Sequence, residues 1–258
     1  MISTFSRPIV RRALTSVCRN KPTRSMGQPR CYSSQSPPPT SSKKKVLTTL
    51  GCCALTGGAV YATMAIQHAD ALVDQRVSLL GTTENDVAIA IAERENLPVV
   101  RAARENPDMF EFEAYAYLKG SAKVQSLTAA TLRGKGRIIV PPVLFYNKDR
   151  TEAMAVVHLG SDLCGHIGIV HGGMIATLLD EILACVALPA LPRFVGYTAN
   201  LNVDYRKPLK AGQWVVLKSR LNRVEGRKAY VEAWVESADG QTKFTEAKSL
   251  YVGPKMPF

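Results

Sequence analysis

From residue 138 to the C-terminus, apolar and polar residues alternate in short runs, which is the pattern of strands with one buried face. An opening pair of strands is predicted over residues 138–146 and 152–159, with a polar turn at 147–150 between them. Pro141 and Pro142 suit an edge or a bulge of the first strand, because proline donates no hydrogen bond to a neighbouring strand.

Four longer strands follow in the last third of the chain. They are predicted over residues 194–205, 214–224, 228–237 and 242–252. Glu225-Gly226 and Asp239-Gly240 are typical of hairpin turns between consecutive antiparallel strands.

One helix separates the two groups of strands. The segment 172–187 is apolar on most sides and is followed by Pro189 and Pro192, which end it. A single apolar helix between an opening hairpin and an antiparallel meander predicts an α+β fold, in which the sheet wraps around one long central helix.

Residues 70–137 predict a helical and irregular lead-in. A helix is expected over residues 70–96, with Thr83 and Asp86 in a capping-box arrangement, and a second short helix over 98–103. The aromatic residues that follow fit either an edge strand or a loop packed on the core; they are Phe110, Phe112, Tyr115 and Tyr117. The basic run 133–137 is interpreted as a turn and not as a phosphate loop, because no helix follows it.

Residues 46–66 carry no charge over 21 positions, about the length that crosses a bilayer as a helix. We therefore expect a single membrane span within the segment 43–69; the alternative is a buried or interfacial helix. Lys43, Lys44 and Lys45 precede it and favour an N-terminus in the matrix, which would place the domain in the intermembrane space.

The formal net charge of +12 is concentrated at the N-terminus. Ten of the 33 Lys and Arg residues lie in residues 1–69, where there is no acidic residue. Residues 1–42 are rich in Arg and Ser and predict a mitochondrial transit peptide with a linker; a basic arm that binds nucleic acid is the alternative. Because the remaining charges nearly cancel, no nucleic-acid partner is expected for the folded domain.

The six cysteines do not predict a disulfide framework, since four of them lie before residue 54. Cys164, His166 and His171 have spacings that could suggest a metal site, but a fourth ligand is missing. No metal site is expected.

The strongest candidate for chemistry is the start of the central helix. Gly172 and Gly173 stand where the first amide N–H groups of a helix are unpaired and favour an anion or a polarised carbonyl oxygen. Asp180 lies two turns after Gly173 on the same helix face, among apolar neighbours, so it must be paired, protonated or functional. The alternative is that the glycines only permit close packing on the sheet.

The segment 170–180, with its His-Gly-Gly start and an acid nine residues after the histidine, resembles the PaaI-type and THEM-type acyl-coenzyme A thioesterases. Those proteins have the hotdog fold, and the resemblance covers about residues 138–254. With its leader and anchor, the chain is similar to a fungal-like, membrane-anchored mitochondrial member of that family.

The resemblance implies a site. Asp180 would activate the attacking water, the amide of Gly172 would polarise the thioester carbonyl, and Thr198, eighteen residues after the acid, would help to hold the water. The family builds its sites across a subunit interface, so a homodimer or a dimer of dimers is expected, with an acyl-CoA as the substrate.

This sequence departs from the family at one position. Many relatives carry an asparagine six residues before the histidine of His-Gly-Gly, where this chain has Gly165 followed by His166. Either His166 supplies the missing polar contact or the site is altered. His171 is interpreted as a structural residue that holds the loop, in preference to a catalytic base.

Further residues are candidates for substrate binding: His171, Gly173, Arg206 and Lys207. Arg206 and Lys207 either meet the phosphates of coenzyme A or are solvated turn charges. The expected activity is thioester hydrolysis without a metal or redox cofactor, coenzyme A being part of the substrate. A non-catalytic acyl-CoA-binding or scaffold protein and a hydroxyacyl-thioester dehydratase are the alternatives, whereas a serine hydrolase is disfavoured because no Gly-x-Ser-x-Gly is present.

Overall fold

A computed structural model describes residues 63–64, 66–78 and 81–255. The predicted transit peptide and residues 46–62 and 65 of the predicted span lie outside these residues. In the part that is described, no helix is long and apolar enough to cross a membrane.

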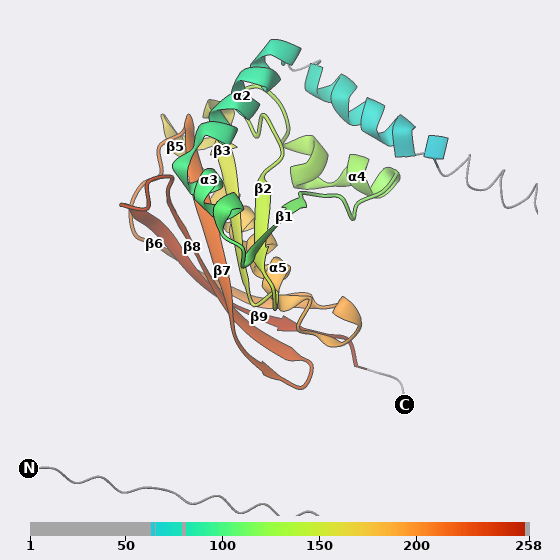
Figure 1. Cartoon of the computed structure of the whole chain (residues 1–258), viewed down its shortest axis with the longest axis vertical. Helices are drawn as coiled ribbons and strands as arrows, with labels where there is room; N and C mark the ends of the chain where they lie inside the picture. Colours follow the sequence, from blue (N-terminus) through green and yellow to red (C-terminus); the bar gives the residue numbers. More distant parts are fainter. Residues whose placement is uncertain (1–62, 65, 79–80, 256–258) are drawn as a thin grey trace, which may run out of the picture. The chain divides into compact units, whose positions relative to one another are not determined.

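Seven strands form one sheet in the order β1-β2-β3-β7-β8-β9-β6, with every neighbouring pair antiparallel (Figure 1). Their bounds are β1 Met109–Glu113, β2 Val143–Asn147, β3 Glu152–Leu159, β6 Tyr197–Tyr205, β7 Gln213–Glu225, β8 Lys228–Ser237 and β9 Lys243–Val252. The predicted antiparallel meander is confirmed, and β3 and β8 have the predicted bounds.

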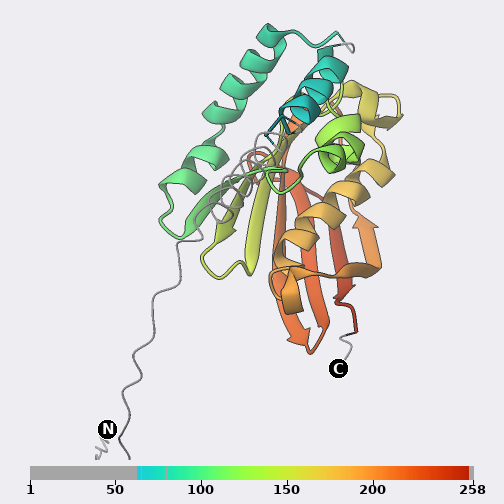
Figure 2. The same ribbon diagram turned by 90° about the vertical axis from the view of Figure 1, so that its right-hand side faces the viewer.

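Helix α5 (Gly172–Ala187) lies along one face of the sheet, and its bounds are the predicted ones (Figure 2). Eight of its apolar side chains are buried against β3, β7, β8 and β9. Each fully buried Leu or Ile contributes about 2 kcal/mol, so this contact stabilises the core. The expected arrangement, an antiparallel sheet around one central helix, is confirmed.

The lead-in covers the opposite face of the sheet over β2, β3 and β7. Helix α3 (Pro98–Glu105) buries Val100 against Phe145 of β2, Val156 of β3 and Val216 of β7. Figure 2 shows the sheet between α5 on one side and α3, with α2 (Glu84–Asn96), on the other. Strand β3 is therefore buried on both faces, which explains why its sequence is apolar at almost every position.

The prediction of a single helix over residues 70–96 is wrong, because two separate helical segments occupy this region. Residues 66–78 are helical, and α2 begins only at Glu84. Gly81 has a φ of +73°, which ends helical geometry, and Thr83 caps the new helix. The capping box is confirmed: the Asp86 amide donates to Thr83 Oγ1 at 3.1 Å, and the Thr83 amide donates to Asp86 Oδ2 at 2.9 Å.

Two predicted strands start later than expected. The strand predicted from residue 138 begins at Val143, because Pro141 and Pro142 cannot donate to a ladder. The strand predicted from residue 194 begins at Tyr197, after the 3₁₀ turn η3 (Pro192–Phe194).

The segment left open between an edge strand and a loop contains the edge strand β1, which pairs with β2. After it come α4 (Ser121–Gln125) and a π-helical turn, η1 (Leu127–Thr131), neither of which was predicted. The 3₁₀ turn η2 (Ser161–Leu163) and the small hairpin of β4 (Cys164–His166) and β5 (Ile169–Val170) then lead into α5.

Candidate active site

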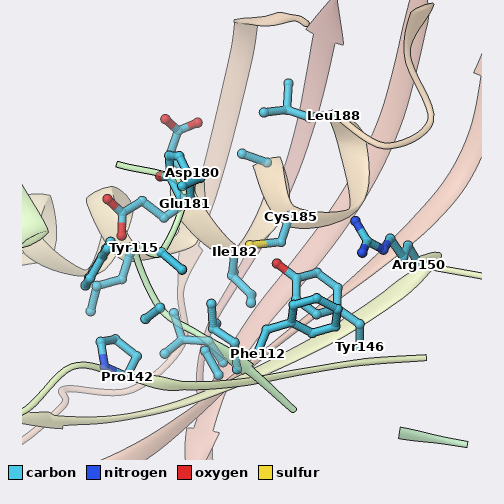
Figure 3. Close-up of a pocket in the computed structure, with 18 of the residues that line it drawn as sticks. Phe112, Tyr115, Pro142, Tyr146, Arg150, Asp180, Glu181, Ile182, Cys185 and Leu188 are labelled. Carbon is cyan, nitrogen blue, oxygen red and sulfur yellow. The ribbon is translucent and has the colours of Figure 1, made fainter. Parts of the chain in front are cut away.

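A pocket of about 580 Å³ lies between α5, the strands and the residues that follow β1 (Figure 3). Its carboxyl groups are Asp180 and Glu181 of α5 and Glu113 of β1, and aromatic and aliphatic side chains form most of its remaining wall. Glu181 and Tyr115 lie at one end of the pocket, and Tyr146, Arg150 and Leu188 lie at the other. A predominantly apolar cavity with a few converging polar groups is the usual form of a small-molecule site.

Asp180 is half-buried, and two hydroxyl groups hold its carboxylate. Thr198 donates to Asp180 Oδ1 at 2.8 Å, and the Tyr251 hydroxyl donates to the same oxygen at 2.8 Å. Oδ2 accepts no hydrogen bond from the described residues. The carboxylate is thus fixed through one oxygen and leaves the other available to a bound water.

Tyr251 was missed by the sequence analysis. It lies directly across from Thr198 in the β6–β9 pairing, and its single hydroxyl hydrogen is shared between Asp180 Oδ1 and the main-chain oxygen of Asp180, 2.7 Å away. Burial raises the pKa of the Tyr251 hydroxyl, and the neighbouring Asp180 raises it further, so Tyr251 remains a proton-carrying donor. Only the register of β6 on β9 could have revealed this residue, because Tyr251 is far from Asp180 in sequence.

His171 caps the start of α5. Its Nδ1 accepts a hydrogen bond from the Gly173 amide at 2.9 Å, so in the neutral ring the proton is on Nε2. The amide of His171 donates to Leu163 O at 2.7 Å, which fixes the loop to the preceding turn. These contacts are those expected of a residue that holds the loop.

The Gly172 amide has no acceptor among the described residues, although its carbonyl accepts a hydrogen bond from the Tyr205 hydroxyl at 2.8 Å. As the first residue of α5, Gly172 presents this free N–H at the positive end of the helix. A free amide in this place is a suitable donor to a polarised carbonyl oxygen.

Gly165 lies against the His171 ring. A Cβ atom at position 165 would come within 2.8 Å of His171 Cδ2, so an asparagine there would require the ring to move. His166, the neighbour of Gly165 on β4, is exposed and does not line the pocket.

The two halves of the predicted site are separated within one chain. Gly172 and Asp180 are eight residues apart on α5, which corresponds to about 12 Å along the helix axis. A water held by Asp180 and a carbonyl held by Gly172 must be within about 3 Å of each other for attack. One chain therefore does not bring these two groups together on one substrate.

The basic residues after β6 are not equivalent. Arg206 pairs with Glu246 at 3.1 Å and with Asp204 at 3.2 Å, whereas Lys207 makes no ion pair with the described residues. In the described part of the chain, no three His, Cys, Asp or Glu side chains gather as a metal site would require.

Comparison with known proteins shows what part of this chain is similar to. Residues 167–244 match the family model described as the thioesterase superfamily. The chain is 32% identical over 166 residues to the UPF0644 protein of Schizosaccharomyces pombe, covering 62% of this chain and 63% of that protein. It is 34% identical over 152 residues to the acyl-coenzyme A thioesterase THEM4 of Mus musculus, covering 59% of this chain and 64% of that protein.

A longer but weaker similarity links the chain to the uncharacterized mitochondrial membrane protein FMP10 of Saccharomyces cerevisiae. The two are 24% identical over 200 residues, which cover 75% of this chain and 79% of that protein. Residues 167–244 are therefore similar to the thioesterase superfamily, and the antiparallel sheet around one central helix is the arrangement expected of the hotdog fold. The chain spans less than two thirds of the length of the first two relatives.

Proposed function

We propose that the protein is an acyl-CoA thioesterase in which Asp180 is the general base. The observation that carries this proposal is the carboxylate itself: Oδ1 is held by Thr198 and Tyr251, and Oδ2 is free beside an apolar pocket. The thioesterase-superfamily match and the similarity to THEM4 support the same reaction class.

The reaction proceeds in two steps. A water bound to Asp180 Oδ2 attacks the thioester carbonyl carbon and gives a proton to the carboxylate, while the negative charge on the carbonyl oxygen is stabilised by the Gly172 amide. The C–S bond then breaks, and the proton passes to the coenzyme A thiolate, which leaves a carboxylic acid and free coenzyme A. This chemistry requires neither a metal nor a redox cofactor.

We also propose that the site forms across a homodimer. The separation of Gly172 and Asp180 on one helix supports this arrangement, as does strand β6, an edge of the sheet with Tyr197 and Tyr205 exposed. A nine-residue edge strand offers unpaired backbone groups to a second copy. Assembly through this edge would bring the Gly172 amide of one subunit toward the Asp180 of the other.

A second hydrogen-bond donor to the thioester carbonyl oxygen is needed in place of the family asparagine. His171 Nε2 makes no hydrogen bond with the described residues, and its ring is held by the amide of Gly173. We propose His171 Nε2–H, in place of His166, as a second donor to the carbonyl oxygen, because the Gly173 amide fixes the His171 ring. Gly173, whose amide holds the His171 ring, then acts indirectly on the substrate.

The decisive test is hydrolysis of a panel of acyl-CoA esters by the full chain in detergent, compared with Asp180→Asn. Loss of the general base should lower kcat about 10²- to 10⁴-fold. Asparagine keeps the hydrogen-bonding shape, so the variant should fold normally. Equal thiol release by the two proteins would show that Asp180 is not the base.

A non-catalytic acyl-CoA-binding module is the second candidate, and the replacement of the family asparagine by Gly165 favours it. It predicts that the wild-type chain binds acyl-CoA but releases no thiol from any ester in the panel.

We further propose a mitochondrial location with a single inner-membrane span. The acid-free, arginine-rich leader and the uncharged segment 46–66 support it, as does the similarity to a mitochondrial membrane protein of yeast.

A further inference from the structure

Among the described residues that line the pocket, Arg150 alone carries a positive charge. Its guanidinium carbon lies 5.1 Å from the centre of the Phe112 ring and 5.9 Å from that of Tyr146. Figure 3 shows the guanidinium turned toward Tyr146 at one end of the pocket, with Asp180 and Glu181 at the other end. The pocket therefore carries acidic groups at one end and a basic group at the other, with a mostly apolar wall between them.

The charge of Arg150 has no counter-ion among the described residues. The carboxyl groups that line the pocket, on Glu113, Asp180 and Glu181, form no ion pair with it, and its guanidinium makes no hydrogen bond with the described residues. Arg206, in contrast, pairs with a carboxylate on the open sheet. Contact with aromatic rings steadies a guanidinium but leaves its N–H groups available to an anion.

The turn that carries Arg150 is held in one shape. The φ of Arg150 is +54°, a left-handed conformation that glycine or asparagine adopts more easily. Its amide donates to Asn147 O at 3.0 Å, and Asn147 Oδ1 accepts from the amides of Thr151 at 2.8 Å and Glu152 at 3.0 Å. Because strained backbone is found disproportionately at functional sites, an arginine in this conformation supports a role for its side chain.

We propose that Arg150 binds the distal carboxylate of a dicarboxylic acyl chain whose thioester lies at Asp180. A guanidinium can donate two parallel hydrogen bonds to one carboxylate. Leu188 lies at the same end of the pocket as Arg150 and is eight residues from Asp180, about 12 Å along the helix axis, so the chain is of medium length. This inference rests on the proposed function, because it assumes that the acyl chain occupies this pocket.

The charges of the pocket predict a dependence on chain length. A short dicarboxylic chain would place its free carboxylate near Asp180 and Glu181, which repel it. A longer chain would extend past Ile182 and Cys185, which lie between the two ends in Figure 3, and would bring its carboxylate to Arg150. An acyl chain without a second carboxylate gains nothing from Arg150. The preference for a dicarboxylic ester should therefore reverse between short and medium chains.

The test compares pairs of coenzyme A esters that have the same chain length and differ in the distal group. They are butanoyl with succinyl, hexanoyl with adipoyl, octanoyl with suberoyl, and decanoyl with sebacoyl, each given to the full chain in detergent with thiol release as the readout. We expect the dicarboxylic ester to have the lower kcat/KM in the shortest pair. In one of the longer pairs its kcat/KM should be higher about fivefold or more, a modest factor because Arg150 is exposed.

Three variants locate the preference. In Arg150→Gln the ratio for the longer pair should fall to about one or below, whereas Arg150→Lys keeps the charge without the two parallel donors and should retain part of the preference. Lys148→Gln removes a positive charge from the same turn but outside the pocket lining, so it should keep the wild-type ratio. Because Arg150 is exposed, the Tm of Arg150→Gln should stay close to that of the wild type, which shows that the variant is folded.

Two results would overturn the proposal: no dicarboxylic ester preferred by the wild type at any length, or a preference that survives in Arg150→Gln. An equal rise of KM for both members of every pair is a form of the second result. It would assign Arg150 to the phosphates of coenzyme A, which all the esters share.

Failure of the proposed function is recognised separately. If no ester releases thiol, hydrolysis is contradicted, and binding of suberoyl-CoA and octanoyl-CoA to the wild-type chain, measured by calorimetry, still tests Arg150. Tighter binding of the dicarboxylic ester that Arg150→Gln abolishes would support the Arg150 site without hydrolysis, and equal binding would overturn it. Hydrolysis of all the esters with no dependence on Arg150 would overturn the site and leave the proposed function intact.

Discussion

At the scale of single residues, the site depends on how one carboxylate is held. Thr198 and Tyr251 both donate to Oδ1 of Asp180, so rotation of the carboxylate would break two hydrogen bonds at once. Thr198 could be placed from the sequence because its spacing from Asp180 matches a family pattern. Tyr251 could not, since its position depends on how β9 pairs with β6.

Tyr251 is a positioning residue, and Tyr251→Phe tests it. Loss of one hydrogen bond to the carboxylate should lower kcat about tenfold and leave KM nearly unchanged, because the ring and its packing are retained. Steady-state kinetics on one acyl-CoA would measure the two constants, with Tyr230→Phe as the matched control. An effect confined to KM would show that Tyr251 contacts the substrate instead of orienting Asp180.

At the scale of elements, the sequence predicted α5, β3 and β8 to the residue, because the apolar period and the flanking prolines and glycines agree there. The predicted bounds were less accurate where a local turn interrupts the hydrophobic pattern. The helix predicted over residues 70–96 is interrupted at Gly81. The strand predicted from residue 138 begins only after Pro141 and Pro142. The pocket-lining turn at Tyr115 was not predictable, since no sequence rule places a tyrosine at positive φ.

Helix α5 contributes to two sites if the enzyme is a dimer, and complementation tests this. Gly172 is the first helical residue, and the extended backbone of His171 before it is compatible with proline at position 172. Gly172→Pro removes the free amide, whereas the control Gly172→Ala adds a Cβ atom and keeps the amide. Gly172→Pro and Asp180→Asn should each be inactive alone.

In mixed dimers of these two variants, one site has both defects and the other has neither. Random mixing should then restore about a quarter of the wild-type thiol release, because half of the dimers carry one intact site of two. The measurement is activity after co-expression with two affinity tags. Absence of recovery, with mixed dimers isolated, would place the whole site within one subunit.

At the scale of the whole molecule, the basic charge is unevenly distributed along the chain. The excess of basic residues lies in residues 1–69, while the rest of the chain is nearly neutral. Composition alone was sufficient to recognise this division, because it needs no knowledge of tertiary contacts.

A fusion of residues 1–69 to a fluorescent protein should be imported into mitochondria and remain in the membrane pellet after alkaline carbonate extraction. A fusion of residues 1–42 should be imported and released by the same treatment, because it lacks the uncharged segment. If carbonate extraction released both fusions from the membrane pellet, residues 46–66 would not span the membrane.

The pocket draws its walls from two parts of the chain. Asp180 and Thr198 lie inside residues 167–244, which match the thioesterase family, whereas Tyr115 and Tyr117 come from the lead-in before that region. Under the proposed function, mutations in the lead-in would change which acyl group fits without altering the groups that activate water. Within a lineage of such proteins, substrate preference could diversify while the hydrolytic step is inherited intact.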